Sequence, residues 1–147
     1  MFKTKKMLNK GFTLIELLAV LSILLLFSLI AIPRIIIGID NNKKEAFISD
    51  AKKMVSSAKY KFSMAKYKDI FYDKDGCKVV TLSDLKLDIV KDPDNNLYSL
   101  KDTEVYICLI DDTYSYFIKL TPLYSGRGTI SRINIDDLKI KDIVKVK

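Results

Sequence analysis

Histidine and tryptophan are absent from the 147 residues of the chain, and cysteine occurs only twice. Without histidine, the usual general base and the commonest metal ligand are missing, and a Ser-His-Asp triad cannot be built. The acidic pairs Asp111-Asp112 and Asp136-Asp137 lie in predicted turns, where solvated carboxylates are the rule. We therefore expect a protein that is not an enzyme and that has neither a cofactor nor a metal centre.

Charge is absent from the stretch between Leu17 and Pro33. As a helix this stretch is about 25 Å long, and it reaches about 33 Å when counted from Phe12, at ~1.5 Å per residue. That length crosses a hydrocarbon core of ~30 Å. Positive residues beside such a span stay on the cytoplasmic side, and the preceding segment carries Lys3, Lys5, Lys6 and Lys10. We expect residues 12–33 to anchor the chain in the cytoplasmic membrane as a single pass, with the N-terminus in the cytoplasm.

An ordinary secretory cleavage site is also lacking, since the one candidate, around Leu29 and Ala31, does not follow the A-x-A pattern. A membrane-tethered extracellular binding domain behind an ordinary signal is nevertheless an alternative. The formal charge of +7 falls to +3 without the four lysines named above. The overall charge therefore overstates any affinity for nucleic acid.

Glu16 is the acid set near the start of the apolar run. A carboxylate within the hydrocarbon core costs on the order of 2.5–3.5 kcal/mol. One explanation is a first-turn acid favoured by the helix dipole, worth ~0.3–1 kcal/mol. The other is a cationic partner, such as a new α-amine at Phe12 made by cutting after Gly11. Phe12 and Glu16 are four residues apart and share a helix face, and a neighbouring helix could supply the same amine.

The run from Gly11 to Leu17, GFTLIEL, resembles the cleavage and methylation signature of type IV pilins and pseudopilins. The resemblance implies that a prepilin peptidase cuts after Gly11 and methylates Phe12. It implies that Glu16 pairs with a neighbour's terminal amine during assembly, and that Pro33 is a helix-kinking proline. The chain is then divided into a leader (1–11), a hydrophobic anchor and assembly helix (12–39) and a globular pilin-like domain (40–147).

The apolar run continues into a helix that we predict to extend from residue 12 to about residue 68. Pro33 lacks the N–H group and clashes with the preceding turn, and Gly38 follows it closely. We expect a kink between Pro33 and Gly38, or a stretch able to unwind. Beyond residue 40, one apolar stripe recurs at three- and four-residue spacing, formed by Phe47, Ala51, Met54, Val55, Ala58, Phe62 and Ala65.

Lysines cover the other faces of this second helix half, namely Lys43, Lys44, Lys52, Lys53, Lys59, Lys61, Lys66 and Lys68. A solvated face explains them, and a surface that binds DNA phosphates is the alternative. The apolar stripe must be buried on something. We therefore predict an α+β fold in which this helix packs on a small antiparallel sheet of about four strands, as in pilins.

The strands of that sheet are indicated by short β-rich runs. Residues 77–82 form one run, and residues 104–110 and 114–120 flank a turn and give the best hairpin signal. Residues 125–128 are predicted to form a turn, residues 129–135 a strand, and residues 138–146 a last edge strand whose lysines protect the edge.

Two features of the globular domain remain open at this stage. Cys77 and Cys108 can form a disulfide outside the membrane, but the sequence does not show whether they approach each other. Asp73-Lys74-Asp75-Gly76 is a fragment of a calcium loop that lacks the other ligands. The loop from Asp92 to Tyr98 resembles one that neighbours calcium in some pseudopilins, although Asp94 and Asn95 replace the usual tryptophan and glycine. A Ca²⁺ ion is not expected.

From the resemblance, the expected function is that of a structural subunit of a type IV pilus. The membrane-anchored prepilin becomes part of a homopolymeric extracellular filament on the cell surface. The expected partners are further copies of the chain, a prepilin peptidase, a platform membrane protein and a motor ATPase. A minor pilin or pseudopilin of a competence or secretion machine is the alternative, and DNA binding would favour it.

Overall fold

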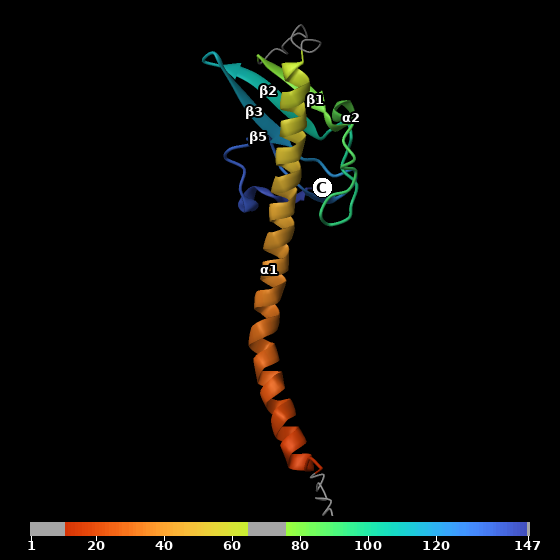
Figure 1. The fold of residues 1–147 in the computed structure, drawn as a ribbon, viewed down its shortest axis with the longest axis vertical. Coiled ribbons are helices and arrows are strands. Elements are labelled where there is room, and N and C mark those ends of the chain that lie inside the picture. The colour runs from red at the N-terminus through yellow and green to blue at the C-terminus, as the bar shows by residue number, and fades with distance from the viewer. Residues whose placement is uncertain (1–10, 65–75, 147) are drawn as a thin grey trace, which may run out of the picture. The chain divides into compact units, whose positions relative to one another are not determined.

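The structure, a computed structural model, describes residues 11–64 and 76–146. The chain divides into two compact units, Met1–Ile39 and Asp40–Lys147, called here the N-terminal unit and the C-terminal unit. Helix α1 (Leu14–Ser63) contributes to both (Figure 1). The predicted leader up to residue 10, the predicted helix end at residues 65–68 and the calcium-loop fragment at residues 73–75 lie outside the described residues.

In the N-terminal unit, α1 is helical without a break through Pro33 and Gly38. The kink between Pro33 and Gly38, or the ability of this stretch to unwind, remains a prediction. Two hydroxyl groups in the apolar part are satisfied within the helix, since Ser22 and Ser28 each donate a 2.8 Å hydrogen bond to the carbonyl oxygen four residues earlier. These bonds give each hydroxyl group a hydrogen-bond partner that an apolar solvent could not supply.

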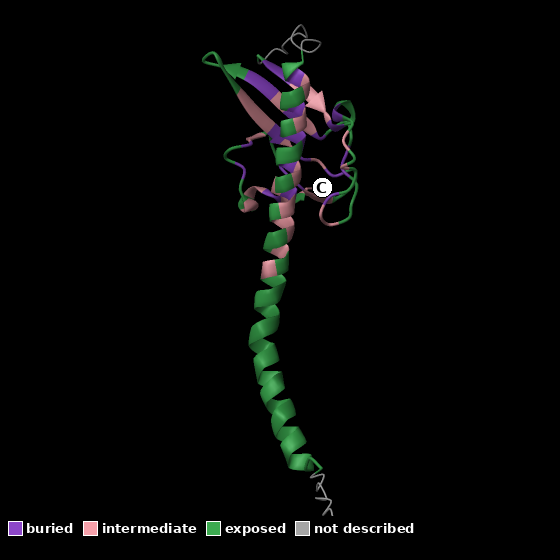
Figure 2. Ribbon diagram, in the orientation of Figure 1, coloured by how far each residue is buried: buried purple, intermediate pink, exposed green. Residues whose placement is uncertain are grey.

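In the C-terminal unit, α1 buries one stripe and exposes the rest, as Figure 2 shows by the alternation of colours along the helix. The predicted stripe is confirmed for the described residues, Phe47, Ala51, Met54, Val55, Ala58 and Phe62, all of which are buried. They form one core with side chains of the sheet, among them Val105, Ile107 and Ile118. Burial of an apolar side chain of this size contributes about 1.5–3 kcal/mol, so this seam holds the helix on the sheet.

The sheet is antiparallel and has the strand order β1-β2-β3-β5. Its strands are β1 (Cys77–Thr81), β2 (Glu104–Ile110), β3 (Thr113–Lys119) and β5 (Ile133–Asn134). The predicted α+β class with about four antiparallel strands is confirmed. The short helix α2 (Leu82–Leu85) follows β1 and begins with a capping box between Thr81 and Asp84. In the predicted β2–β3 hairpin, the two turn residues, Asp111 and Asp112, have φ angles of 48° and 60°.

The turn predicted at residues 125–128 is wrong. Residues Gly126–Gly128 form strand β4, which pairs with β6 (Val144–Val146) in a second, two-stranded sheet. Glycine is required at position 128, because a Cβ there would collide with the carbonyl group of Leu120. Gly128, which suggested a turn, instead permits this close approach of two backbone segments.

The predicted strand at residues 129–135 is shortened to β5, Ile133–Asn134. Thr129 explains the difference, because its N–H group donates to the Leu120 carbonyl at 2.9 Å and its hydroxyl accepts from the Leu120 N–H at 3.0 Å. The chain is thus held at Thr129 by local bonds outside a regular ladder. The predicted last strand, 138–146, is likewise shorter, since the 3₁₀ helix η2 (Ile140–Asp142) precedes β6.

Candidate functional site

The first turn of α1 is organised by Thr13 and Glu16. The Glu16 carboxylate oxygen Oε2 accepts hydrogen bonds from the Thr13 N–H at 2.8 Å and from the Thr13 hydroxyl at 2.9 Å. In return, the Glu16 N–H donates to Thr13 Oγ1 at 3.3 Å. This reciprocal arrangement is a capping box, which satisfies donors that the helix itself cannot. These hydrogen bonds support the first explanation for Glu16, in which the acid stabilises the start of the helix.

Gly11 and Phe12 precede the helix in an exposed segment without regular secondary structure. The Phe12 side chain is 86% exposed. A Cβ atom at Gly11 would meet nothing within 4 Å, so packing does not require a glycine at this position. The predicted cleavage and methylation sites thus lie side by side in accessible backbone, one residue before the capping box.

The apolar surface of α1 in the N-terminal unit has no cover in the structure. Its most hydrophobic 18-residue window has a mean hydropathy of 2.8 and no buried residue, and Figure 2 shows this part of α1 exposed throughout. By length and composition the helix could cross a membrane. An exposed surface of this kind requires lipid or other protein around it.

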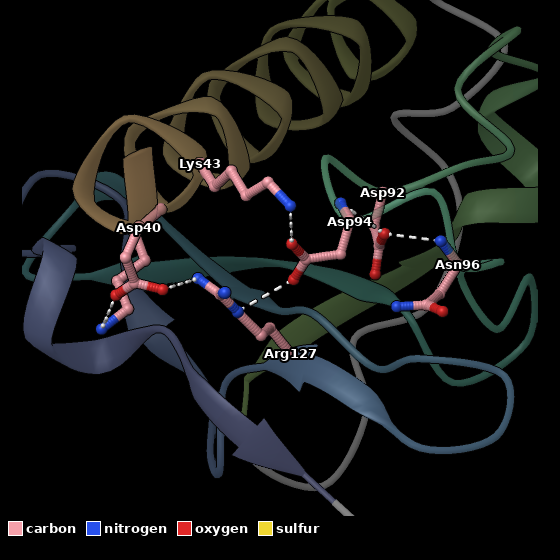
Figure 3. A network of polar contacts seen from close by, with 7 residues as sticks. Asp40, Lys43, Asp92, Asp94, Asn96 and Arg127 are labelled. Atoms are coloured by element: carbon pink, nitrogen blue, oxygen red, sulfur yellow. Dashed lines mark hydrogen bonds and ion pairs between the residues drawn. The ribbon is translucent and has the colours of Figure 1, made fainter. Parts of the chain in front are cut away.

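Within the C-terminal unit, Arg127 of β4 connects Asp40, where the α1 segment of this unit begins, to the loop at residues 91–97 (Figure 3). Its Nε lies 2.9 Å from Asp94 Oδ2, and its Nη1 lies 2.8 Å from Asp40 Oδ1. The second contact is an ion pair without hydrogen-bond geometry. Lys43 and Lys44 extend the network to Asp94 at 3.0 Å and to Asp40 at 3.2 Å. The hydrogen bond from Lys44 and the charge of Arg127 lower the pKa of Asp40.

The loop at residues 91–97 is shaped by Asp92. Its Oδ1 accepts from the N–H groups of Asp94 and Asn96, at 2.9 and 2.8 Å, which fixes a tight polar turn. Both carboxylate oxygens of Asp94 are bound to Lys43 and Arg127, and the expected absence of a calcium ion stays a prediction. Within residues 11–64 and 76–146, no group of three or more acidic, cysteine or histidine side chains is arranged to hold a metal.

Tyr98 anchors the end of this loop in the core. Its ring packs edge-on against Phe47, with centroids 6.1 Å apart, and only 1% of the residue is exposed. Burial, followed by the nearby Asp50 charge, raises the pKa of the Tyr98 phenol. The hydroxyl makes no hydrogen bond of acceptable geometry to the described residues.

The lysine-rich face of α1 is largely engaged in contacts within the C-terminal unit. Lys53 pairs with Asp50 at 3.4 Å, Lys61 donates to the Asp84 carbonyl, and the Lys59 ammonium lies over the Tyr116 ring. Lys66 and Lys68 lie outside the described residues. These contacts explain the lysines without a nucleic acid, and DNA binding stays a prediction.

Cys77 and Cys108 are directly opposite each other in the register of β1 and β2 and form a disulfide. The bond joins an edge strand of the sheet to the strand that packs under α1. It is therefore a structural link within the C-terminal unit.

Two arrangements were not predicted from the sequence. The capping box had a readable signal, the T-x-x-E spacing of Thr13 and Glu16 before an apolar run. The Arg127 network had none, because it joins residues 40, 94 and 127, whose proximity depends on the tertiary fold.

Comparison with known proteins supports the N-terminal site. Residues 6–32 match the family model of the prokaryotic N-terminal methylation motif. Comparison with curated proteins and with solved structures gave no match. Together with the accessible Gly11–Phe12 bond and the uncovered apolar helix that follows it, the match identifies this N-terminus as the processing signature of type IV pilin precursors.

Proposed function

We propose that the chain is a structural subunit of a type IV pilus. The observation that carries the proposal is the combination of the methylation motif at residues 6–32 with a helix whose apolar surface is uncovered between Leu14 and Ile39. Cleavage after Gly11 removes the leader and makes Phe12 the methylated N-terminus. The same apolar surface first contacts lipid in the membrane and later packs against the same surface of neighbouring subunits in the filament core.

Glu16 gives this assembly its specificity. Cleavage places a new cationic amine on Phe12, the residue next to Thr13, whose N–H group already donates to Glu16 Oε2. In the described part of the chain, Glu16 Oε1 has no hydrogen-bond donor. This free oxygen is available for an amine from a neighbouring subunit, and a charge pair formed in an apolar core is much stronger than one in water. Such a pair would fix the axial position of one helix against the next.

The remaining partners follow from the same proposal. A prepilin peptidase processes the precursor, and a platform membrane protein with a motor ATPase moves it from the membrane into the filament. The C-terminal unit then forms the outer surface of the filament outside the cell. The chain acts by assembly, so no turnover is proposed.

The test is the N-terminus of protein sheared from the cell surface. Mass spectrometry should find a mature chain that starts at N-methyl-Phe12, in sedimentable filaments in which this chain is the main component. A minor pilin or pseudopilin would show the same terminus at a trace level. A mature chain that starts after Ala31, or one that retains Met1, would refute the proposal.

Gly11→Ala supplies a matched variant for processing, because a Cβ at this position has open space around it. We expect Gly11→Ala to accumulate uncleaved precursor, with at least a tenfold lower ratio of mature to precursor chain on an immunoblot. Lys10→Arg keeps the leader charge and should be processed normally. Equal processing of the two variants would show that the peptidase does not read Gly11.

A further inference from the structure

A groove of about 630 Å³ lies in the C-terminal unit next to the Arg127 network. Its walls come from the start of the helical part of this unit, the loop at residues 91–97, and strands β4 and β6. Its cations are Lys44, Arg127, Lys141 and Lys145, and its acids are Asp40 and Asp94. Cations therefore outnumber acids on its walls.

The two acids of the groove are already neutralised within the unit. Asp40 is paired with Lys44 and Arg127, and Asp94 with Lys43 and Arg127. By contrast, Lys141 and Lys145 are exposed and have no ion pair with any residue in the described part of the chain. The groove thus presents two uncompensated positive charges.

The turn between β2 and β3 has the opposite character. Asp111 and Asp112 are adjacent, exposed and without an ion pair to the described residues. The flanking side chain of Ile110 is 46% exposed. The turn is therefore a narrow projection that combines two carboxylates with an aliphatic side chain.

The groove and the turn lie at opposite ends of the C-terminal unit. Asp40 lines the groove, whereas Tyr114, beside the turn, packs its ring against Phe62 with centroids 5.1 Å apart. Along α1, residues 40 and 62 are separated by about 33 Å at ~1.5 Å per residue. Figure 1 shows the β2–β3 turn and the β6 region at the two ends of this unit. One copy cannot join these two surfaces, but two copies can.

We propose that the Asp111–Asp112 turn of one subunit docks into the Lys141–Lys145 groove of another. The proposal rests on the proposed filament function and names a contact between its C-terminal units. Such a contact joins two different surfaces head to tail, which is the type of interface that builds open helical assemblies. The charges make the contact dependent on salt, and Ile110 adds apolar contact with the groove wall near Val144. The occupant of the groove is thus a second copy of this chain.

Cysteine cross-linking in intact filaments of the full chain tests the contact directly. The double variant Asp112→Cys/Lys145→Cys should give a ladder of disulfide-linked oligomers on a non-reducing gel after mild oxidation. The native cysteines are already paired with each other. The matched control Asp137→Cys/Lys145→Cys uses an exposed acid from a different turn and should give no ladder. Filaments of the first variant that yield only monomers would overturn the proposal.

Charge neutralisation provides a second measurement that does not depend on the cysteine variant assembling. Asp111→Asn/Asp112→Asn keeps residues that tolerate a positive φ, and Lys141→Gln/Lys145→Gln removes the opposite charges. Each pair should lower the yield of sheared filaments at least threefold, and the quadruple variant should lower it no further, because both pairs remove the same contact. The control Asp136→Asn/Asp137→Asn should behave as wild type.

The outcomes separate the two proposals. Wild-type protein that is never cleaved or never sediments as filaments would refute the pilus function itself. Normal wild-type filaments with unchanged yield in both neutralised pairs, or with losses that multiply in the quadruple variant, would refute only the docking of the turn into the groove.

Discussion

Glu16 has a role before assembly as well as during it. Its capping box with Thr13 supports the helix start in the uncleaved chain, and an N-terminal cap is worth about 0.5–2 kcal/mol. Capping needs a hydrogen-bond acceptor at this position, whereas pairing with an amine needs a charge. A glutamine can complete a capping box but carries no charge. The two roles can therefore be separated by substitution.

We predict that Glu16→Gln will insert into the membrane and be cleaved like wild type, but will enter filaments at least tenfold less. Glu16→Ala should show the same assembly defect and, in addition, fraying of the first helical turn. The ratio of filament to membrane-pool protein measures assembly, and hydrogen exchange of residues 14–17 in detergent measures fraying. Normal assembly of Glu16→Gln would leave capping as the whole role of Glu16.

Arg127 is a residue whose position in the sequence gave no indication of its partners. It was predicted as part of a turn, but it lies in β4 and bridges Asp40 and Asp94. The error has a physical cause, because a three-residue strand is stabilised by its pairing with β6 and not by local preference. Residues 91–96, by contrast, were predictable as a loop from their proline, aspartate and asparagine content.

We predict that Arg127→Met will destabilise the C-terminal unit by about 1 kcal/mol, since Asp94 keeps Lys43 as a partner and is 15% exposed in its side chain. Arg127→Lys should recover part of this loss, because one ammonium group reaches only one carboxylate well. Urea unfolding of the full chain in detergent, followed by near-ultraviolet circular dichroism, measures both. Equal stability of all three proteins would show that the network is only a surface feature.

The pH dependence of this network has a definite sign. The pKa of Asp40 lies below its ordinary value of 3.8, first because of the hydrogen bond from Lys44 and then because of the Arg127 charge. The contribution of Asp40 to the stability of the C-terminal unit is therefore complete above that ordinary pKa value, and it is lost as the pH falls below it. Arg127→Met should reduce, but not abolish, the loss of stability as the pH falls below 3.8.

At the scale of elements, periodicity identified the parts that bury a regular face. The stripe from Phe47 to Phe62 and the hairpin of β2 and β3 were predictable because each pattern repeats with the period of its own element. Strand β5 and the end of the chain were predicted too long, because side-chain bonds from Thr129 and the 3₁₀ turn at Ile140–Asp142 interrupt the pattern. Interactions of this kind leave no periodic signal.

The disulfide links β1 to the rest of the sheet, with 31 residues of sequence separation between Cys77 and Cys108. Closing a loop of this length stabilises by roughly 3–4 kcal/mol in the chain-entropy model. We predict that Cys77→Ala/Cys108→Ala will lower the urea midpoint of the C-terminal unit accordingly, while membrane insertion and cleavage after Gly11 stay normal. A midpoint equal to that of the oxidised wild type would show that the sheet does not depend on this bond.

The whole molecule consists of two units with different solvent requirements. The C-terminal unit has its own core, whereas the apolar side chains of the N-terminal unit between Leu14 and Ile39 are exposed. A charge placed in the middle of the apolar surface of the N-terminal unit should therefore weaken membrane anchoring and leave the fold of the C-terminal unit intact. Leu25 is suitable for this purpose, since it is 67% exposed and lies within the uncharged stretch.

We predict that Leu25→Lys will release the uncleaved chain from membranes washed with alkaline carbonate, whereas the wild type stays in the pellet. A lysine at the centre of a membrane span costs about 2.5–3.5 kcal/mol, which is about a hundredfold in the partition equilibrium. Ser131→Lys, on the exposed surface of the C-terminal unit, adds the same charge and should remain in the pellet. Retention of Leu25→Lys at the wild-type level would mean that another part of the chain holds it to the membrane, and the apolar helix would then no longer explain both anchoring and assembly.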